Sequence, residues 1–359
     1  MTGPSISMAG LRSFYAGRRV LVTGHTGFKG AWLVLWLQRL GAQVTGFALD
    51  PPTDPSIFAQ GKLAERMQSI RGDVRDLASV EACFREARPE VVFHLAAQSL
   101  VRPSYADPIG TFATNVMGTA HVLDAVRRSR DVVATVVVTS DKCYENREWI
   151  WPYRESDPMG GYDPYSASKG CAELVTSSFS RSFFSGKGIA SGRAGNVIGG
   201  GDWSLDRLVP DAMRAFAEAR PVRLRNPASL RPWQHVLEPL LGYLGLGARL
   251  GAEPERFAGG WNFGPHEDDV RPVSDVVNLL AAAWGEGARA EVEGGEHPHE
   301  AKILRLDATK ARTELGWRPR LALRDAATWT AAWYRDVGRG AGVVDRTLQD
   351  IQRYEEHER

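Results

Sequence analysis

The stretch RRVLVTGHTGFKG, residues 18–30, decides the fold. Arg18 to Thr23 is a short apolar strand, and an apolar-periodic helix is expected from Ala31 to Leu40. Between them lie three glycines in the spacing G-x-x-G-x-x-G, at Gly24, Gly27 and Gly30. In a dinucleotide-binding turn the first glycine permits the tight turn, the second admits the pyrophosphate and the third lets helix and strand pack closely. The helix N-terminus then offers unpaired amides to the phosphates, so we expect a dinucleotide site here.

Two further features extend this expected site. Thr26, Phe28 and Lys29 belong to the same turn and are expected to border the cofactor. A second strand, Gln43 to Leu49, ends at Asp50, twenty residues past Gly30. An acid there accepts hydrogen bonds from the adenosine ribose and repels a 2′-phosphate, which favours NAD over NADP. The alternative is a turn acid ahead of two prolines.

The next strands carry weaker candidates. A third strand ends in Gly72-Asp73-Val74, which places Asp73 and Val74 against the adenine, and a fourth runs from Val91 to Leu95. Small residues follow, so Leu95, Ala96 and Ala97 are expected to pack against the cofactor ribose. Gln98 and Arg102 are candidates for substrate contact, with an exposed loop as the alternative. Asn115, in an expected helix from Pro108 to Arg128, contacts the cofactor or satisfies nearby backbone.

The chemistry-bearing stretch follows a β-branched run, Val132 to Val138, that is typical of a buried parallel strand. Ser140, Asp141 and Lys142 emerge at the carboxyl end of that strand, where catalytic groups gather in open α/β sheets. Tyr165 and Lys169 follow at i, i+4 spacing, on one helix face. An ammonium beside a phenol favours the phenolate, so Tyr165 can act as a base. These five residues are the predicted catalytic group.

Strands and helices alternate as far as Ser140, which predicts an α/β, Rossmann-type, doubly wound parallel sheet. The alternation weakens after about Leu205, and we expect a smaller mixed α/β domain that binds substrate. The expected divisions are a flexible leader (1–17), an NAD-binding domain (18–195), an interleaved substrate domain (196–340) and a tail helix (341–359). Asn196, Arg207 and Arg231 are the candidates there for a sugar diphosphate, because amides and guanidinium groups bind phosphates.

Composition excludes several classes of protein. The 359 residues are 43% hydrophobic and 24% charged, with a formal net charge of +1, so nothing favours nucleic acid as a partner. No apolar run reaches the ~18 residues of a membrane span. Three scattered cysteines favour a reduced, cytoplasmic setting. His297-Pro298-His299 lacks a third ligand, so no metal is expected.

These motifs together resemble the extended short-chain dehydrogenase/reductase family over about Arg18 to Tyr334. The resemblance rests on TGHTGFKG, Asp50, Gly72–Val74, HLAAQ at 94–98, Asn115, YSASK at 165–169 and RAGNVIGGGDW at 193–203. Within the family the chain most resembles the CDP-glucose 4,6-dehydratases, through TSDKCYEN, PMGGYDPYSASKGCAELV and the DRLVPD run. The dTDP-glucose enzymes carry Thr-Asp-Glu where this chain has Ser140-Asp141-Lys142.

The resemblance implies a lyase that uses NAD on CDP-glucose or a similar nucleotide sugar, in deoxysugar biosynthesis of the kind that serves lipopolysaccharide O-antigen. It implies that Tyr165 takes the O4 proton as C4 is oxidised, while Lys169 holds the cofactor ribose. Ser140 hydrogen-bonds the O4 region, and Asp141 protonates the departing C6 hydroxyl. Lys142 is either the base at C5 or a cation that stabilises the enolate. A homodimer, or a dimer of dimers, is also implied.

Three other functions remain open from the sequence. One is a different nucleotide-sugar 4,6-dehydratase, acting on a dTDP-, UDP- or GDP-hexose. Another is a 4-epimerase on the same scaffold, which needs Tyr165 and Lys169 but not Asp141 with Lys142. The last is a non-catalytic NAD-sensing protein.

Overall fold

In the computed structural model, residues 5–285, 287–293 and 302–357 are described. This part of the chain contains a seven-stranded sheet in the order β3-β2-β1-β4-β5-β6-β11, in which every neighbouring pair is parallel. The strands are β1 Arg19–Thr23, β2 Gln43–Ala48, β3 Gln68–Arg71, β4 Val91–His94, β5 Ala134–Val138, β6 Gly188–Ala194 and β11 Gly259–Phe263. The order reverses between β1 and β4, as in a doubly wound nucleotide-binding sheet. The predicted fold class is therefore confirmed.

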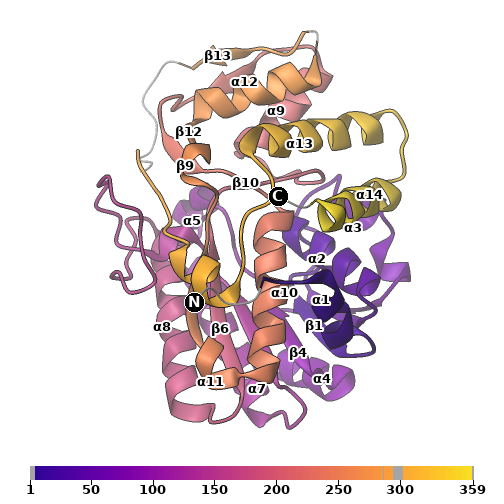
Figure 1. The fold of residues 1–359 in the computed structure, drawn as a ribbon, viewed down its shortest axis with the longest axis vertical. Helices are drawn as coiled ribbons and strands as arrows, with labels where there is room; N and C mark the ends of the chain where they lie inside the picture. The colour runs from indigo at the N-terminus through magenta and orange to yellow at the C-terminus, as the bar shows by residue number, and fades with distance from the viewer. Residues whose placement is uncertain (1–4, 286, 294–301, 358–359) are drawn as a thin grey trace.

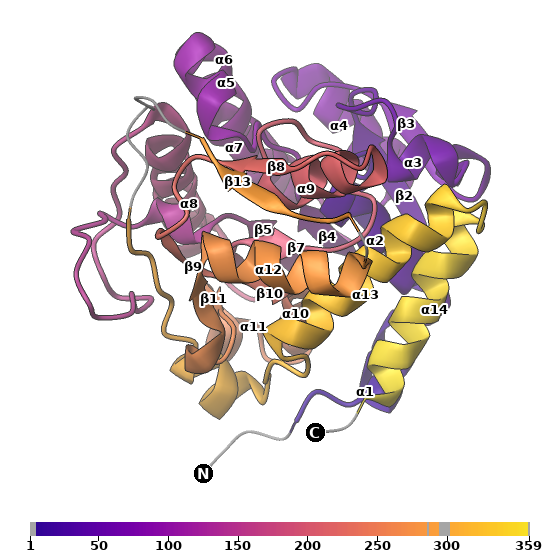
Figure 2. The same ribbon diagram turned by 90° about the horizontal axis from the view of Figure 1, so that it is seen from above.

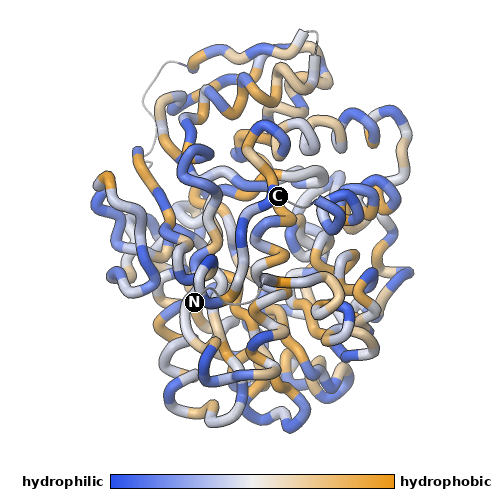
Figure 3. The backbone as a smooth tube through the Cα atoms, in the orientation of Figure 1, coloured by the Kyte–Doolittle hydropathy of each residue, from blue (hydrophilic) through white to orange (hydrophobic). Residues whose placement is uncertain are grey.

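Alternation along the strands explains why both faces of the sheet are covered. In β1, Val20 and Val22 join one hydrophobic cluster while Leu21 joins another, and β5 divides its valines in the same way. The first cluster includes helices α2 and α10, and the second includes α4 and α7. Figure 2 shows α4, α7 and α8 on one side of the strands and α1 and α10 on the other. The apolar strands also stand out in the interior of Figure 3.

Helices account for most of the remaining chain. They are α1 Met8–Tyr15, α2 Phe28–Arg39, α3 Ile57–Gln60, α4 Leu77–Ala87, α5 Val101–Ala106, α6 Pro108–Phe112, α7 Gly118–Arg128, α8 Pro164–Phe183, α9 Leu208–Ala217, α10 Leu237–Ala252, α11 Pro254–Phe257, α12 Val273–Trp284, α13 Leu323–Gly338 and α14 Val343–Glu356. Short 3₁₀ turns occupy η1 Leu63–Glu65, η3 Asp141–Cys143 and η4 Glu267–Asp269, and π-helical turns occupy η2 Ala113–Met117 and η5 Ala311–Leu315. No helix of the described ranges is long and apolar enough to cross a membrane.

A second layer lies above the carboxyl end of the sheet in Figure 1. It consists of α9, α12 and α13 with three two-stranded pairs: β7 Val197–Ile198 with β10 Gln234–His235, β9 Leu230–Pro232 with β12 Val270–Pro272, and β8 Val222–Leu224 with β13 Ala290–Val292. Between these pieces the chain returns to the large sheet, where α10 covers one face and β11 adds the edge strand beside β6. Residues beyond 196 therefore contribute to both layers.

Three local expectations need correction. Part of the expected leader is an ordered helix: α1 buries Leu11 and Tyr15, and Tyr15 Oη donates to the carbonyl of Leu244 at 2.7 Å. Residues 1–4 of that leader lie outside the described residues. The helix expected from Pro108 to Arg128 is interrupted by the π-helical turn η2. The sheet also contains β11, a strand that the sequence Gly-Gly-Trp-Asn-Phe does not predict.

Candidate active site

The start of α8 fixes where Tyr165 and Lys169 lie. Asp163 caps the helix, with Oδ1 accepting from the Ser166 amide at 2.9 Å, and Pro164 occupies the first turn, where proline is favoured. The Tyr165 amide also donates to Ser104 Oγ at 3.1 Å, which ties this end of the helix to α5. Tyr165 and Lys169 are both buried, at 8% and 5% exposure. The helix therefore presents both side chains to the interior beside β5.

Ser140 and Asp141 meet Tyr165 at the end of β5. Burial raises the pKa of Tyr165 to about 12, and a hydrogen bond with Ser140 lowers it, while the Asp141 carboxylate raises it further. Arg207 acts in the opposite direction and lowers the pKa of Tyr165. A phenol in this position becomes a base near neutral pH only when more positive charge comes close to it.

One carboxylate oxygen of Asp141 accepts a hydrogen bond, and the other has no hydrogen-bond partner among the described residues. Ser140 Oγ donates to Asp141 Oδ1 at 2.9 Å and accepts the Lys142 amide at 3.3 Å. Oδ2 is buried without a hydrogen-bond partner among the residues described, and a Cβ placed on Gly195 would lie 3.1 Å from it. The free oxygen therefore lies close to the Gly195 backbone, where a residue with a side chain would crowd it. Lys142 is half-buried in η3.

Lys169 lies against the same strand. Its Nζ donates to the carbonyl of Val138 at 3.5 Å, at the last residue of β5. Burial lowers the pKa of Lys169 to about 8, and the nearby Glu173 carboxylate opposes that shift. The lysine thus titrates within reach of neutral pH, with its protonated form favoured by Glu173.

The glycine turn fits a bound dinucleotide. Gly24 has φ +74°, and a Cβ on it would lie 2.6 Å from the Ala96 amide nitrogen; a Cβ on Gly30 would lie 2.2 Å from the Gly24 oxygen. Gly27 caps α2 with no side-chain hydrogen bond, so the first amides of that helix remain available for a pyrophosphate. Thr26, Phe28, Ser56 and Asp202 line a hollow beside it. A larger side chain at Gly24 or Gly30 would close the turn.

Lys29 connects this turn with the catalytic strand end. Burial lowers its pKa to about 7. Arg207 and Lys169 lower it as well, while Asp141 and Asp202 raise it. The electrostatic influence of these groups on one another places the expected cofactor turn and the expected catalytic group in one site.

The adenosine end of the expected site carries two carboxylates in different settings. Asp50 is 88% exposed and forms an ion pair with Arg71, with Oδ1 and Nε 3.2 Å apart. Asp73 is tied to Arg75, which holds the pKa of that carboxyl below its usual range. The side chain of Val74 is buried, and a Cβ on Gly118 of α7 would lie 2.7 Å from its Cγ2. Arg71 has no role in the sequence analysis, yet it lies beside the acid expected to distinguish NAD from NADP.

Asn115 and Gln98 form hydrogen bonds with each other. Asn115 Oδ1 accepts the Gln98 amide at 2.8 Å, and Asn115 Nδ2 donates to Ser168 Oγ at 2.8 Å. Gln98 Nε2 in turn donates to the Leu100 carbonyl at 2.9 Å and to Thr111 at 3.0 Å. Asn115 lies in the π-helical turn, so the irregular helix delivers it to the loop after β4. The structure thus shows that Asn115 contacts the Gln98 backbone and positions the loop with half-buried Leu95, Ala96 and Ala97, while its contact with the cofactor stays a prediction.

The candidate substrate arginines are paired with acids. Arg207 Nη1 lies 2.9 Å from Asp202 Oδ2, and its Nη2 donates to Ser99 Oγ at 3.2 Å. Arg102 contacts Asp206 at 2.9 Å, and Asp206 also holds Arg225 at 2.9 Å. Arg207 is the one whose charge reaches Tyr165.

The two remaining substrate candidates are Arg231 and Asn196, which lie at different two-stranded pairs of the second layer. Arg231 is buried in β9, and half-buried Asn196 precedes β7, where its carbonyl accepts from Gln234 at 3.0 Å. Within residues 5–285, 287–293 and 302–357, no group of three or more His, Cys, Asp or Glu side chains could hold a metal ion. His297 and His299 lie outside those ranges.

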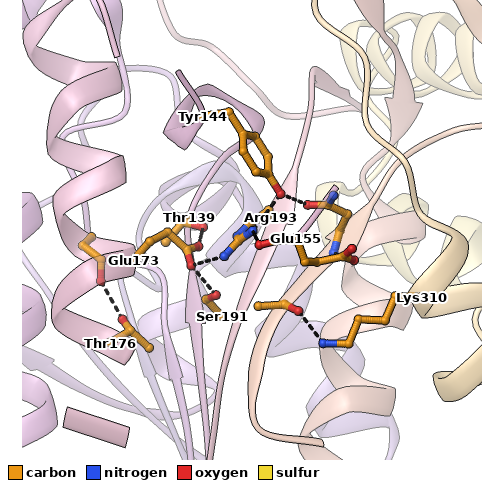
Figure 4. A network of polar contacts seen from close by, with 11 residues as sticks. Thr139, Tyr144, Glu155, Glu173, Thr176, Ser191, Arg193 and Lys310 are labelled. Carbon is orange, nitrogen blue, oxygen red and sulfur yellow. Dashed lines mark hydrogen bonds and ion pairs between the residues drawn. The ribbon is translucent and has the colours of Figure 1, made fainter. Parts of the chain in front are cut away.

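A buried polar network beneath the site was missed by the sequence analysis (Figure 4). Glu173, on α8, forms a 2.7 Å ion pair with Arg193 of β6, and both side chains are about 5% exposed or less. Arg193 Nη1 donates to Tyr144 Oη at 2.7 Å, and Ser191 Oγ donates to Glu173 Oε2 at 2.6 Å. The available signal was the spacing, because Glu173 follows Lys169 by four residues.

Comparison with known proteins agrees with this geometry. The family model described as GDP-mannose 4,6 dehydratase matches residues 21–240. A CDP-glucose 4,6-dehydratase from Salmonella typhimurium is 51% identical over 350 residues, which cover 96% of this chain and 98% of the relative. The chain belongs to the extended short-chain dehydrogenase/reductase family.

More distant members of this family complete the comparison. A dTDP-glucose 4,6-dehydratase from Streptomyces antibioticus is 31% identical over 88% of this chain and 92% of that protein. The solved complex of Thermus thermophilus UDP-glucose 4-epimerase with NAD is 26% identical, with a TM-score of 0.74 over 88% of this chain and 99% of the other. The family resemblance predicted from the motifs is confirmed, and the structure brings the motifs that carry it to one end of the parallel sheet.

Proposed function

We propose that the protein is an NAD-dependent CDP-glucose 4,6-dehydratase, a lyase that converts CDP-D-glucose to CDP-4-keto-6-deoxy-D-glucose. The observation that carries the proposal is the buried Asp141 carboxylate, which has an unpaired oxygen beside Tyr165 and is followed by Lys142. The 51% identity to the Salmonella relative supports the choice of substrate. An epimerase has no need of an acid at this position.

The first proposed step is oxidation at C4 of the sugar. When bound, NAD⁺ supplies the hydride acceptor at C4 and afterwards the hydride donor for C6. Tyr165 takes the proton from O4, with Ser140 holding the same oxygen through its hydroxyl. The protonated Lys169 contacts the ribose and adds the positive charge that Tyr165 needs against its burial. The helix α2 amides, with Thr26 and Phe28, hold the pyrophosphate, and Asp50 accepts from the adenosine ribose.

The second proposed step is loss of water across C5 and C6. The C4 ketone acidifies the hydrogen at C5, and Lys142 either removes that proton or, while a different base removes it, stabilises the enolate as a cation. C5 is protonated again when C6 receives its hydride, which completes the 4-keto-6-deoxy sugar. Asp141 delivers a proton to the departing C6 hydroxyl through Oδ2, the oxygen that Ser140 leaves free. Arg207, whose charge acts on Tyr165, is placed to hold the sugar diphosphate, with Gln98, Arg102, Asn196 and Arg231 as further candidates.

A substrate panel tests this proposal. The protein is incubated with NAD and with CDP-, dTDP-, UDP- or GDP-glucose in turn, and products are followed by proton NMR. A new C6 methyl signal with CDP-glucose, at a rate at least tenfold above the other nucleotides, is expected. An inverted C4 centre without a methyl signal would instead identify an epimerase, and no product from any sugar would contradict an enzymatic role.

We also propose a homodimer. Ile109, Met117 and Leu174 are 78%, 51% and 60% exposed on α6, η2 and α8, which lie side by side. Apolar side chains on neighbouring helices suit a helical interface between two copies. The three cysteines are free thiols, which fits the cytoplasm, and the product suits synthesis of O-antigen deoxysugars.

A further inference from the structure

Figure 4 shows a buried ion pair between Glu173 and Arg193. Glu173 is on α8, the helix of Tyr165 and Lys169, and Arg193 is on β6, beside β5, the strand that ends at Val138 two residues before Ser140. Both side chains are removed from water, and desolvation of two charges costs more than an exposed ion pair returns. A buried pair is therefore weak as a stabilising device, and its contacts with the site suggest another role.

Every oxygen of Glu173 is used. Oε1 accepts from Thr139 Oγ1 and Oε2 accepts from Ser191 Oγ and Arg193, so the carboxylate stays charged and its pKa lies below its usual value despite burial. Thr139 precedes Ser140 directly, and its amide donates to the Gly192 carbonyl at 3.0 Å. Glu173 thus fixes Thr139, the residue directly before Ser140.

Arg193 holds the other end of that segment. Its Nη1 donates to Tyr144 Oη at 2.7 Å and to the Glu155 carbonyl at 3.1 Å, and its guanidinium carbon lies 5.2 Å from the Tyr144 ring centre. Tyr144 Oη donates onward to Asn262 Oδ1 at 2.7 Å. Residues 139 and 144 bracket Ser140, Asp141 and Lys142, so the ion pair clamps both sides of the catalytic turn.

We propose that Glu173 and Arg193 are positioning residues of the proposed dehydratase: Glu173 lies one helical turn from Lys169 on the same face of α8 and sets a carboxylate beside that ammonium, and the pair fixes the turn that carries Ser140, Asp141 and Lys142. The part of this inference that is tested by kinetics on a nucleotide sugar rests on the proposed function. The cofactor-binding arm of the inference stands separately, because a charged Lys169 is required to hold the ribose whatever sugar is used.

The charged and titratable groups around Lys169 are few. Glu173 lies one turn along α8, and Cys143 faces it from η3; these two raise the pKa of Lys169. The positive charge of Lys169 in turn lowers the pKa of His94 on β4 and the pKa of Lys29 on α2. Glu173 is therefore the one acid whose carboxylate is shown to favour the ammonium within the described residues.

Glu173→Gln tests the electrostatic part through NAD binding measured calorimetrically across pH. The variant should lose affinity at a pH about 1 unit lower than the unaltered protein, because an opposite charge at this range shifts a pKa by one or more units. Glu155→Gln is the matched control: Glu155 faces the far side of Arg193 and contributes nothing to Lys169, so its midpoint should not move. A Glu173→Gln midpoint equal to the control overturns this part.

A double variant distinguishes the proposed role of the ion pair from a purely structural one. Glu173→Gln combined with Arg193→Gln removes both buried charges and restores neutrality. If the pair is only structural, the double variant regains the unaltered midpoint, which overturns the proposal. If the proposal holds, the double variant folds, melts cooperatively and keeps the lowered midpoint.

Thr139→Val tests the clamp on the catalytic turn, with Thr139→Ser as the conservative variant. The valine has almost the same shape but cannot donate to Glu173. We expect kcat on CDP-glucose to fall about tenfold with KM unchanged, and serine to restore it. A valine variant with unaltered kcat overturns the clamp. If the unaltered protein binds NAD but dehydrates no nucleotide sugar, the proposed function fails while the NAD-binding arm still decides the role of Glu173.

Discussion

Ser140 Oγ donates a 2.9 Å hydrogen bond to Asp141 Oδ1, while Asp141 Oδ2 is buried without a partner in the described part of the chain. A buried carboxylate oxygen without a hydrogen bond is costly, because its lost hydration is not replaced. The arrangement suits a group that meets its partner only when substrate is present. Ser140 sets the orientation of the carboxylate, and Gly195 has no side chain that would crowd Oδ2.

Asp141→Asn should therefore stop the elimination and leave the oxidation. The amide cannot protonate a leaving hydroxyl, so we expect 4-keto-6-deoxy product to fall by about 10²–10⁴-fold, the usual contribution of a general acid. Reduced nicotinamide should accumulate and be visible by its absorbance. The control is Asp124→Asn, at a half-buried acid of α7 that pairs with Arg127 and Arg128, and it should behave normally. Undiminished product from Asp141→Asn would remove the acid role.

Lys142→Met should separate cofactor binding from proton transfer at C5. Methionine keeps the apolar stem and loses the amine, so NAD affinity should stay within about twofold. Exchange of the C5 hydrogen with deuterated solvent should be lost, whether the lysine acts as a base or as a cation. Mass spectrometry of the recovered sugar measures the exchange. Full turnover with normal exchange would exclude both roles of Lys142.

Asp50→Ser should weaken the preference for NAD over NADP. The ion pair with Arg71 shows that a guanidinium already lies where a 2′-phosphate is expected to come. Removing the carboxylate leaves that positive charge unpaired, so NADP affinity should rise relative to NAD by on the order of tenfold. Calorimetric titration with each cofactor measures the ratio. Adding Arg71→Ala to the variant should abolish the gain, and an unchanged ratio in Asp50→Ser would argue against ribose contact.

The fold could be predicted where short-range sequence carries the signal. The glycine turn, the β-branched run before Ser140 and the helix that carries Tyr165 and Lys169 depend on neighbours in the chain, and each forms where expected. Helix α1 depends on α10, through a hydrogen bond between residues 229 positions apart, so its sequence alone reads as a loose leader. Strand β11 likewise exists because it pairs with β6.

The site residues also divide into those with a local sequence signal and those that depend on long-range contacts. Tyr165 and Lys169 are recognisable from their spacing, and Asp141 from its place after a strand. Arg193 offered no such signal, because its partner Glu173 lies 20 residues away on another element. Arg71 reaches Asp50 only through the parallel pairing of β2 with β3. Long-range ion pairs of this kind require the register of the sheet, which composition and periodicity do not provide.

Leu174→Asp should separate the proposed dimer. The side chain is 60% exposed on α8, and a charge buried between two copies costs several kcal/mol. Sedimentation velocity should show a monomer, with the thermal melt of the subunit changed little. Val292→Asp, at an apolar residue of β13 that is 70% exposed, is the control and should leave the dimer intact. Equal sedimentation of Leu174→Asp and the unaltered protein would exclude α8 from an interface.

Glu238→Gln should change how stability depends on pH. Burial raises the pKa of Glu238 to about 7, although Tyr354 and the amides of Arg320 and Leu321 hydrogen-bond its carboxylate. The folded protein therefore holds this proton more tightly than the unfolded chain, whose glutamate titrates near its usual value of 4.5. Stability from this group is full below pH 4.5 and falls as pH rises towards 7, by about 3 kcal/mol in all.

Buried His94 and His235 have pKa values lowered to about 3, and they oppose this trend by adding stability as pH rises to 6.5. The difference in unfolding free energy between Glu238→Gln and the unaltered protein cancels those histidines and isolates Glu238. Urea unfolding at pH 5 and pH 8 measures it. The variant should gain stability relative to the unaltered protein at the higher pH, and a difference independent of pH would show that Glu238 is already ionised in the fold at pH 5.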